Sequence, residues 1–170
     1  MRTAAIWVVL LSQLAVAAAA SVPQADSSAS PPTAYCNFDD GNQVSMQYND
    51  ADLSNKEQPR AGKVWAPGGA PMVLYAQTAM TLAGTAIPVG AYTVYVIPNK
   101  KDWTLIVNRN VKAGSAYDQT QDLTRASMEL GEIGESTKQL QVSFGHLGPK
   151  QCNLRLYYQK TGAFVDFMEK

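Results

Sequence analysis

The sequence predicts an all-β domain, arranged as a β-sandwich or a jelly-roll-like fold of about eight strands. Three observations support this fold class. Short segments are dense in β-branched and aromatic residues. Gly, Pro, Asn and Asp separate these segments at short intervals, as turns do between strands. No segment carries a convincing helical pattern of apolar residues.

The N-terminal segment has the composition of a secretory signal peptide. Arg2 supplies a positive charge, residues 4–20 are almost entirely apolar, and this run ends in small residues that suit cleavage. The alternative is a transmembrane anchor, but a run of about 17 residues is at the short limit for a span. We therefore expect residues 1–20 to be removed, leaving no membrane anchor, and the protein to reach the periplasm or the extracellular space.

A linker and a single β domain are expected to follow. Residues 21–34 are rich in Ser, Pro and Ala and lack apolar periodicity, which is typical of a linker. The remaining residues, 35–170, are few enough for one domain and sufficient to bury a core.

The first strands of this domain follow from local patterns. Residues 44–48 alternate apolar and polar side chains, and residues 72–81 form a plausible strand. The strongest strand is predicted at 92–97, where β-branched and aromatic residues dominate. The loop at 98–102 then predicts a hairpin with a strand at 103–108.

Two polar loops and four further strands complete the prediction. The loops cover residues 49–60 and 110–121, and the second is long enough to suggest a functional role. The four strands are expected at 123–130, 139–144, 152–159 and 163–168.

The two cysteines, Cys36 and Cys152, are expected to form a disulfide bond. An even number of cysteines in an exported chain indicates pairing. Alternate residues of a strand share a face, so Cys152 shares its face with the apolar Leu154, and Cys36 shares its face with Phe38. Two free buried thiols are the alternative. A metal site is not expected, since Zn²⁺ requires closely spaced ligand pairs.

Charge and composition exclude some classes of function. The chain has 14 basic and 14 acidic side chains, and charged residues make up 16% of it. Nucleic-acid binders need a basic surface to displace counterions, so no nucleic-acid partner is expected. No cofactor is indicated either.

No catalytic motif is apparent, and the protein is therefore not expected to be an enzyme. The only histidine, His146, lies in a turn-like Gly and Pro segment with no nucleophile marked beside it, and no Gly-x-Ser-x-Gly motif occurs. Residues 39–42 (Asp-Asp-Gly-Asn) contain part of a calcium-loop pattern. They fit a hairpin turn better, because the remaining ligand positions are missing.

Four segments of the chain resemble a known family. They are Gly-Lys-Val-Trp at 62–65, Pro-Val-Gly-Ala-Tyr-Thr-Val-Tyr-Val-Ile-Pro at 88–98, Asp-Trp-Thr-Leu-Ile-Val-Asn at 102–108, and Tyr-Asp at 117–118 followed by Asp122 and Arg125. In this order they resemble a bacterial exported family, numbered twenty-nine eleven among the domains of unknown function. The resemblance implies an all-β fold with a cysteine near each end, in agreement with the expected disulfide. It implies no activity, substrate or partner.

The chain departs from this family in one segment. The family continues the Lys-Val-Trp phrase with Arg and then Gly-Ala-Asn-Glu, whereas this chain has Ala66, Ala70 and Pro71 at the Arg, Asn and Glu positions. Trp65 and Gly68 match the family. If those polar residues form a site in the family, that site is missing here.

The candidate ligand-binding residues lie in the second loop and among the aromatic side chains. Tyr117, Asp118, Asp122 and Arg125 sit in or beside the loop and could form one polar wall of a cleft. The alternative is a loop held in place by an Asp–Arg ion pair.

Trp65 and Tyr157 are the aromatic candidates. Trp65 belongs to the segment that resembles the family, and strand parity places Tyr157 on the outward face. Aromatic rings on a sheet face can stack on sugars, although most aromatic residues of this chain are expected to pack in the core.

Three functions are compatible with these observations. The first is a non-catalytic binding or structural module of the bacterial envelope, with an envelope glycan or protein as partner. The second is a carbohydrate-active or other hydrolase that uses loop carboxylates, which would need two carboxylates at a defined spacing across a cleft. The third is an envelope assembly subunit that pairs through an exposed strand edge.

Overall fold

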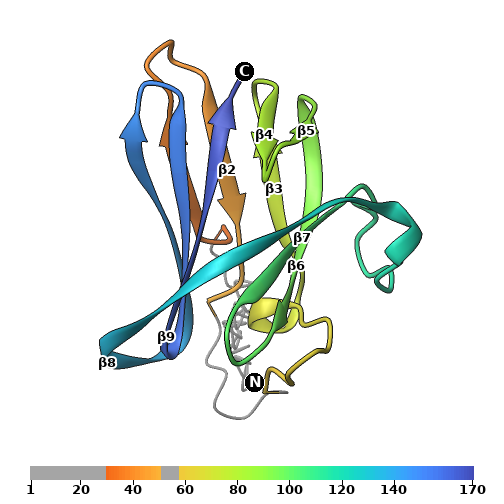
Figure 1. Cartoon of the computed structure of the whole chain (residues 1–170). Helices are drawn as coiled ribbons and strands as arrows, with labels where there is room; N and C mark the ends of the chain where they lie inside the picture. The colour runs from red at the N-terminus through yellow and green to blue at the C-terminus, as the bar shows by residue number, and fades with distance from the viewer. Residues whose placement is uncertain (1–29, 51–57) are drawn as a thin grey trace, which may run out of the picture.

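A computed structural model describes residues 30–50 and 58–170 (Figure 1). The expected signal peptide, most of the expected linker and part of the 49–60 loop lie outside these residues. The described part is mostly β, with nine strands, two short 3₁₀ helices and no α-helix. The predicted fold class is therefore confirmed.

The strands form one antiparallel sheet in the order β1-β2-β3-β6-β7-β8-β9-β4-β5. Their bounds, with those of the 3₁₀ helices, are β1 (Thr33–Asn37), β2 (Gln43–Gln47), η1 (Pro67–Gly69), β3 (Met72–Ala76), β4 (Met80–Leu82), β5 (Thr85–Ile87), β6 (Gly90–Pro98), β7 (Trp103–Asn108), η2 (Gln119–Gln121), β8 (Asp122–Gly148) and β9 (Gln151–Glu169).

The two longest strands each reverse direction, as Figure 1 shows for β8 at the lower left. β8 pairs first with β7 and then with β9, and its register with β9 shifts between Glu132 and Gln141. β9 reverses at Gln159, whose φ is 52°. Each of these strands therefore contains two of the four segments predicted between residues 123 and 168.

The reversal of β9 brings its two ends side by side. The side chains of Gln151 and Asn153 both donate to the Asp166 carboxylate, at 2.9 and 2.7 Å. The Glu169 N–H donates to the Lys150 carbonyl oxygen at 2.8 Å. The last segment of the chain thus returns along the preceding one and then pairs with β4.

The two parts of the sheet, which share β8, face each other across one hydrophobic core. Alternate residues of β1, β2, β3, β6 and β7 contribute to the same buried cluster as alternate residues of β9 and β4. The predicted inward parity is confirmed at Cys36, Phe38, Cys152 and Leu154, all of which are buried. The Sγ atoms of Cys36 and Cys152 are 2.04 Å apart, so the disulfide joins β1 to β9 across the core.

The hairpin predicted around residues 98–102 is confirmed, since β6 pairs with β7 from Thr93 and Asn108 to Pro98 and Trp103. The turn predicted at residues 39–42 is also present. The Phe38 N–H donates to the Asn42 carbonyl oxygen, and the φ of Gly41 is 89°.

The single strand expected at 72–81 is wrong. The chain leaves β3 at Ala76 and re-enters as β4 at Met80, having moved to the other part of the sheet. β3 pairs with β2 and β6, whereas β4 pairs with β5 and β9. Strands in both parts of the sheet need apolar residues. The local pattern therefore does not show where the chain passes from one part of the sheet to the other.

The outer face of β6 and β7 is buried as well. Tyr95 and Ile106, which point away from the main core by strand parity, are 6% and 0% exposed. The ring of Tyr117, from the 109–121 loop, packs against Tyr95 with centroids 4.9 Å apart. This second covered face positions the candidate site.

Candidate functional site

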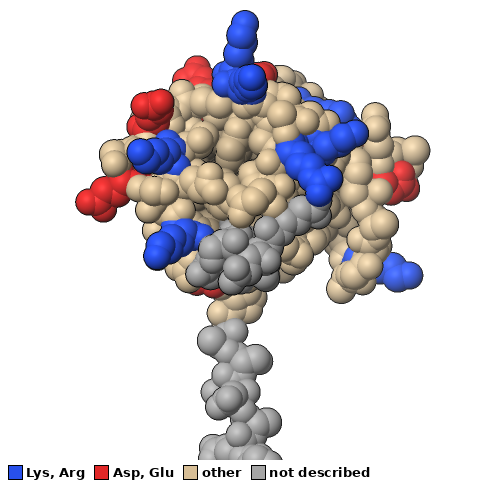
Figure 2. Space-filling model, turned by 90° about the horizontal axis from the view of Figure 1, so that it is seen from below, with Lys and Arg blue, Asp and Glu red and all other residues tan. Residues whose placement is uncertain are grey.

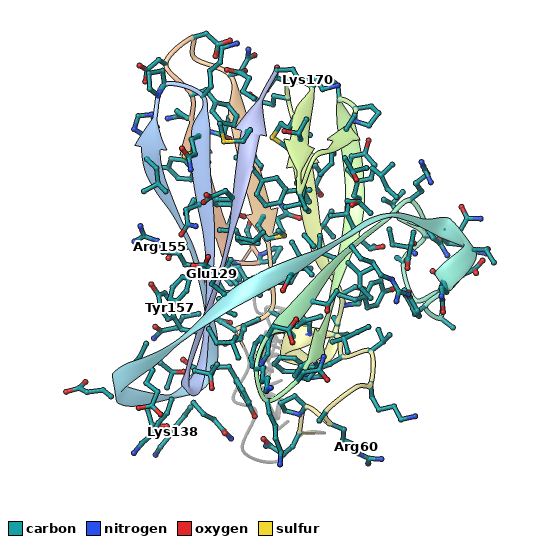
Figure 3. The ribbon with its side chains drawn as sticks, in the orientation of Figure 1. Arg60, Glu129, Lys138, Arg155, Tyr157 and Lys170 are labelled. Atoms are coloured by element: carbon teal, nitrogen blue, oxygen red, sulfur yellow. A yellow bond between two sulfur atoms is a disulfide. The ribbon has the colours of Figure 1, made fainter. Side chains whose placement is uncertain are left out.

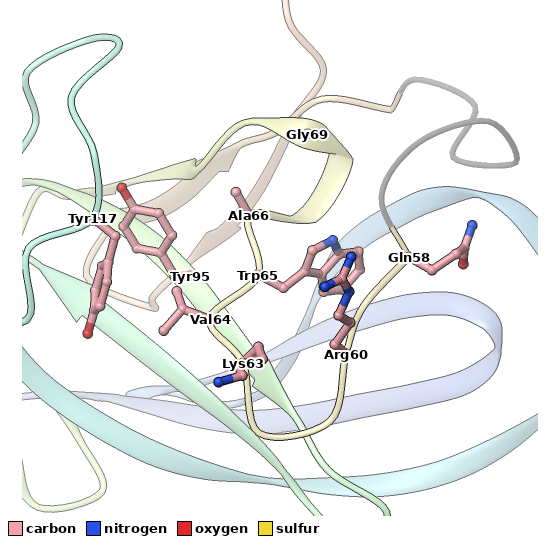
Figure 4. Close-up of a pocket in the computed structure, with 9 residues that line it drawn as sticks. All are labelled: Gln58, Arg60, Lys63, Val64, Trp65, Ala66, Gly69, Tyr95 and Tyr117. Atoms are coloured by element: carbon pink, nitrogen blue, oxygen red, sulfur yellow. The ribbon is translucent and has the colours of Figure 1, made fainter.

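A pocket of about 320 Å³ lies between the 58–69 segment and Tyr117 (Figure 4). Its walls combine three aromatic side chains with two cationic ones. The lining residues are Gln58, Arg60, Lys63, Val64, Trp65, Ala66, Gly69, Tyr95 and Tyr117.

Trp65 anchors the first wall to β6. Its N–H donates to the Val96 carbonyl oxygen at 2.8 Å, and the Val96 N–H donates back at 3.0 Å. Its ring lies 6.0 Å from the Trp103 ring and 5.1 Å from the Tyr158 ring. At 8% exposure, Trp65 is chiefly a core residue that shows only a small part of its surface to the pocket.

The η1 turn completes this wall. Gly68 has a φ of 80°, a left-handed conformation that favours glycine. Its carbonyl oxygen accepts a hydrogen bond from Asn49 Nδ2 at 2.7 Å. The turn thereby holds Ala66 and Gly69 at the pocket.

Tyr117 forms the opposite wall and is held by a network around Asp122. Its hydroxyl donates to Asp122 Oδ2 at 2.7 Å and accepts from Arg125 at 2.8 Å. Arg125 Nε also donates to Asp122 Oδ2 at 2.9 Å. The buried Asn108 donates from Nδ2 to Asp122 Oδ1 at 2.8 Å. Three side chains therefore donate hydrogen bonds to the Asp122 carboxylate.

The electrostatics of this network keep Tyr117 and Arg125 each in one protonation state. Burial, followed by the hydrogen bond to Asp122, raises the pKa of Tyr117. The hydrogen bond to Asp122 raises the pKa of Arg125. Tyr117 thus remains a neutral donor and Arg125 a cation at neutral pH.

Asp118 is separate from this carboxylate cluster. Its side chain accepts from the Thr120 N–H at 2.9 Å and from Thr120 Oγ1 at 2.7 Å, so it caps η2. These two bonds lower the pKa of Asp118. The Asp118 carbonyl oxygen accepts from Asn108, which ties the loop to β7. Its carboxylate is not among the pocket-lining groups.

Tyr157 lies apart from the other candidates. It packs against Phe164 with ring centroids 6.0 Å apart and borders a separate hollow with Thr137 and Lys138. The structure brings Trp65 and Tyr117 to the same pocket, with Asp122 and Arg125 supporting Tyr117, while Tyr157 does not join them.

Sequence reasoning misses six of the lining residues as site residues: Gln58, Arg60, Lys63, Val64, Gly69 and Tyr95. Tyr95 belongs to an apolar strand, which predicts a core position, but its outward parity points to the second face. Lys63 stands in the Gly-Lys-Val-Trp phrase at 62–65 that resembles the family, whereas Arg60 lies just before that phrase and carries no signal. Ala66, the position at which the resemblance implies Arg, lines the pocket.

The Asp122 network gives a direct stability prediction. Asp122→Ala should lower the free energy of unfolding by about 1 to 3 kcal/mol, because it removes the acceptor of three side chains, one of them buried. Urea unfolding measures this loss, and limited proteolysis should detect faster cleavage within residues 109–121.

Asp166→Ala is the matched control for this prediction. Its carboxylate also accepts from two side chains but is exposed, so the expected loss is below about 1 kcal/mol. Equal losses in the two variants would contradict an anchoring role for Asp122.

The remaining candidates form no chemical centre in the described part of the chain. His146 Nε2 lies 3.2 Å from Asp39 Oδ1 at an exposed position. Within residues 30–50 and 58–170, no three His, Cys, Asp or Glu side chains are grouped to hold a metal ion. Nor do these residues include a helix with the length and apolar character needed to cross a membrane.

Comparison with known proteins identifies the family. No curated protein and no solved structure matches the chain. The family described as "Protein of unknown function (DUF2911)" matches residues 30–167, which include every strand from β1 to β8 and nearly all of β9. The chain therefore belongs to this family of proteins of unknown function.

Proposed function

We propose that this protein is exported and that its β domain is a non-catalytic module that binds a fragment of an envelope glycan. The ligand would occupy the pocket between Trp65, Tyr95 and Tyr117. The observation that carries this proposal is the fixed position of Tyr117, whose hydroxyl and ring are both engaged before any ligand arrives. A wall that is already ordered costs little conformational entropy on binding.

The chemistry of the pocket suits a sugar that carries an anionic group. Aromatic rings offer apolar faces to the C–H groups of a sugar ring. The Lys63 ammonium group at the same pocket favours a carboxylate or phosphate on the ligand. A volume of about 320 Å³ is at the lower end of ordinary small-molecule sites.

Among the residues that the structure describes, none of those lining the pocket carries the carboxylate that the hydrolase alternative needs. Asp122 already accepts hydrogen bonds from Tyr117, Asn108 and Arg125, and Asp118 caps η2. A general acid or base must instead reach the substrate with its proton-transfer site open.

The assembly alternative needs a long exposed strand edge. The strands at the two ends of the order, β1 and β5, contain five and three residues, whereas residues 141–148 of β8 pair with β9 along one edge only. Short edge strands are a common way in which proteins avoid pairing with other chains. The short strands β1 and β5 therefore do not favour the assembly alternative, whereas the second edge of β8 residues 141–148 is a feature that suits it.

A pocket-filling variant tests the proposal. Thermal-shift assays with peptidoglycan fragments and charged oligosaccharides should raise the melting temperature of the wild-type protein by about 5 to 10 °C at a hundredfold excess over Kd. Ala66→Trp should abolish this shift, since the indole would occupy the pocket that Ala66 lines.

Ala70→Trp is the control, because Ala70 is exposed in the same segment and does not line the pocket. It should keep the full ligand-induced shift. A shift that survives in Ala66→Trp would place the ligand elsewhere, and no shift with any ligand of this class would overturn the proposal.

A further inference from the structure

Another hollow, next to the one that Tyr157 borders, lies at one end of the sandwich, where several turns meet. The Gly62 N–H donates to the Pro98 carbonyl oxygen at 2.8 Å, which places the 58–63 segment beside the β6–β7 turn. The Tyr158 hydroxyl bonds the Gln58 side chain, which places the same segment beside the reversal of β9. The hollow measures about 430 Å³.

Five of the described lysines surround this end of the molecule, all of them exposed: Lys63, Lys100, Lys101, Lys138 and Lys160. None of them forms an ion pair with a described residue. Figure 2 views this end directly and shows blue side chains bordering a central hollow. Figure 3 labels Lys138 and Arg60 at the same end.

Among the described residues, the acidic side chains of this end only partly offset these charges. Three of them, Asp102, Glu132 and Glu135, belong to the same turns, against five lysines. The red side chains visible in Figure 2 lie at the margin of the face and away from the hollow. The chain as a whole is neutral, so the positive potential is local to this end.

The lining of the hollow is rich in uncharged hydrogen-bonding groups. It includes Thr137, Tyr158, Gln159 and Thr161, with Lys138 and Lys160 at the same site. Among the described residues, Thr137 Oγ1 is shielded from solvent and has no hydrogen-bond partner. Hydroxyl and amide groups of this kind match the hydroxyls of a sugar.

We propose that this lysine-rimmed hollow binds an acidic polysaccharide, through carboxylate or sulfate groups at the lysines and sugar hydroxyls at the lining. The site goes beyond the pocket of the proposed function, which lies on the outer face of β6. Lysine ammonium groups are mobile point charges, and they fit anionic groups spaced along a flexible polymer.

Two other polyanions fit this end less well. A lipid surface calls for exposed apolar side chains beside the cations, and among the described residues of these turns only Val64 is a large apolar residue that is exposed. Single-stranded nucleic acid calls for exposed aromatic rings on which bases stack, whereas the Tyr158 ring is 4% exposed.

The test is binding of the full-length chain to immobilised polygalacturonate, with neutral dextran as the reference polymer. The wild-type protein should bind polygalacturonate and not dextran, and its affinity should fall steeply with added salt. The double variant Lys138→Glu/Lys160→Glu should bind at least tenfold more weakly.

The control reverses the same number of charges at the opposite end of the molecule. Lys150→Glu/Lys170→Glu should change the affinity less than twofold, as Lys150 lies in the β8–β9 turn and Lys170 at the C-terminus, labelled at the top of Figure 3. Lys138→Glu/Lys160→Glu should keep the thermal shift with peptidoglycan fragments, because neither lysine lines the aromatic pocket.

Three results would overturn the proposal. The first is no binding of wild type to polygalacturonate at low salt. The second is an equal loss in the two double variants, which would indicate general charge attraction. The third is tighter binding to single-stranded DNA than to polygalacturonate, which would assign the surface to nucleic acid.

Discussion

Replacing both disulfide cysteines with serine is expected to lower the melting temperature by about 10 to 20 °C. Cys36 and Cys152 are 116 residues apart in the chain, and they connect β1 with β9 across the core. In the chain-entropy account, closing a loop of that length stabilises the folded state by roughly 4 to 5 kcal/mol, because it restricts the unfolded chain. For a domain of this size, that free energy corresponds to the stated shift.

Thermal unfolding of wild type and Cys36→Ser/Cys152→Ser, each with and without reducing agent, measures this effect. Reductant should lower the melting temperature of the wild type towards that of the double variant, and it should not affect the double variant. Identical melting temperatures under oxidising conditions would show that the crosslink does not stabilise the fold.

Gly68→Ala is expected to be the most damaging of the small substitutions considered, at about 2 to 4 kcal/mol. A Cβ at this position would overlap the Asn49 carbonyl oxygen and lie 3.0 Å from the Asn49 Cβ. The backbone φ of 80° is also unfavourable for alanine. Relief requires the η1 turn to move, and with it Ala66 and Gly69 at the pocket.

Gly84→Ala isolates the overlap from the backbone effect. Gly84 has nearly the same φ, 78°, but no neighbouring atom lies within 4 Å of the position that a Cβ would take there. Urea unfolding should show a loss of about 1 kcal/mol for Gly84→Ala. Equal losses for the two variants would remove the contact with Asn49 from this explanation.

Strand parity makes much of the fold predictable. The inward face of Cys152, Leu154, Leu156 and Tyr158 follows from alternation alone, and all four are buried. The hairpin at residues 98–102 is marked by turn residues between two apolar runs. These features depend on residues that are close in the sequence, so the local pattern of residue types predicts them.

The path of the chain between the two parts of the sheet is not predictable in the same way. Whether Met80 continues β3 or begins β4 depends on which strand lies beside it, and that strand is β9, almost ninety residues later. Apolar alternation looks the same in both cases.

The candidate site is predictable where its residues are close in sequence. Tyr117, Asp122 and Arg125 lie within one short stretch, and the structure joins them in one network. Tyr157 is a candidate only because strand alternation places its side chain on the outward face. Alternation does not predict which other side chains lie on that face. Its ring instead packs on Phe164.

Of the phrase that resembles the family, the two matching residues have structural roles. Trp65 pairs with Val96 and packs in the core, and Gly68 allows the η1 turn. The departures differ in position, since Ala66 lines the pocket whereas Ala70 is exposed outside it. Trp65 and Gly68 therefore hold the segment in place, and Ala66 forms part of the pocket wall.

The most direct test of ligand binding at this pocket is an NMR titration of the ¹⁵N-labelled protein with peptidoglycan fragments and charged oligosaccharides. The Trp65 indole N–H, assigned by comparison with Trp65→Phe, reports on one wall, and the amides of Tyr95 and Tyr117 report on the floor and the opposite wall. We predict that one ligand of this class shifts all three signals together in a saturable manner. Saturable shifts confined to other residues, or no shifts at millimolar ligand, would contradict the account.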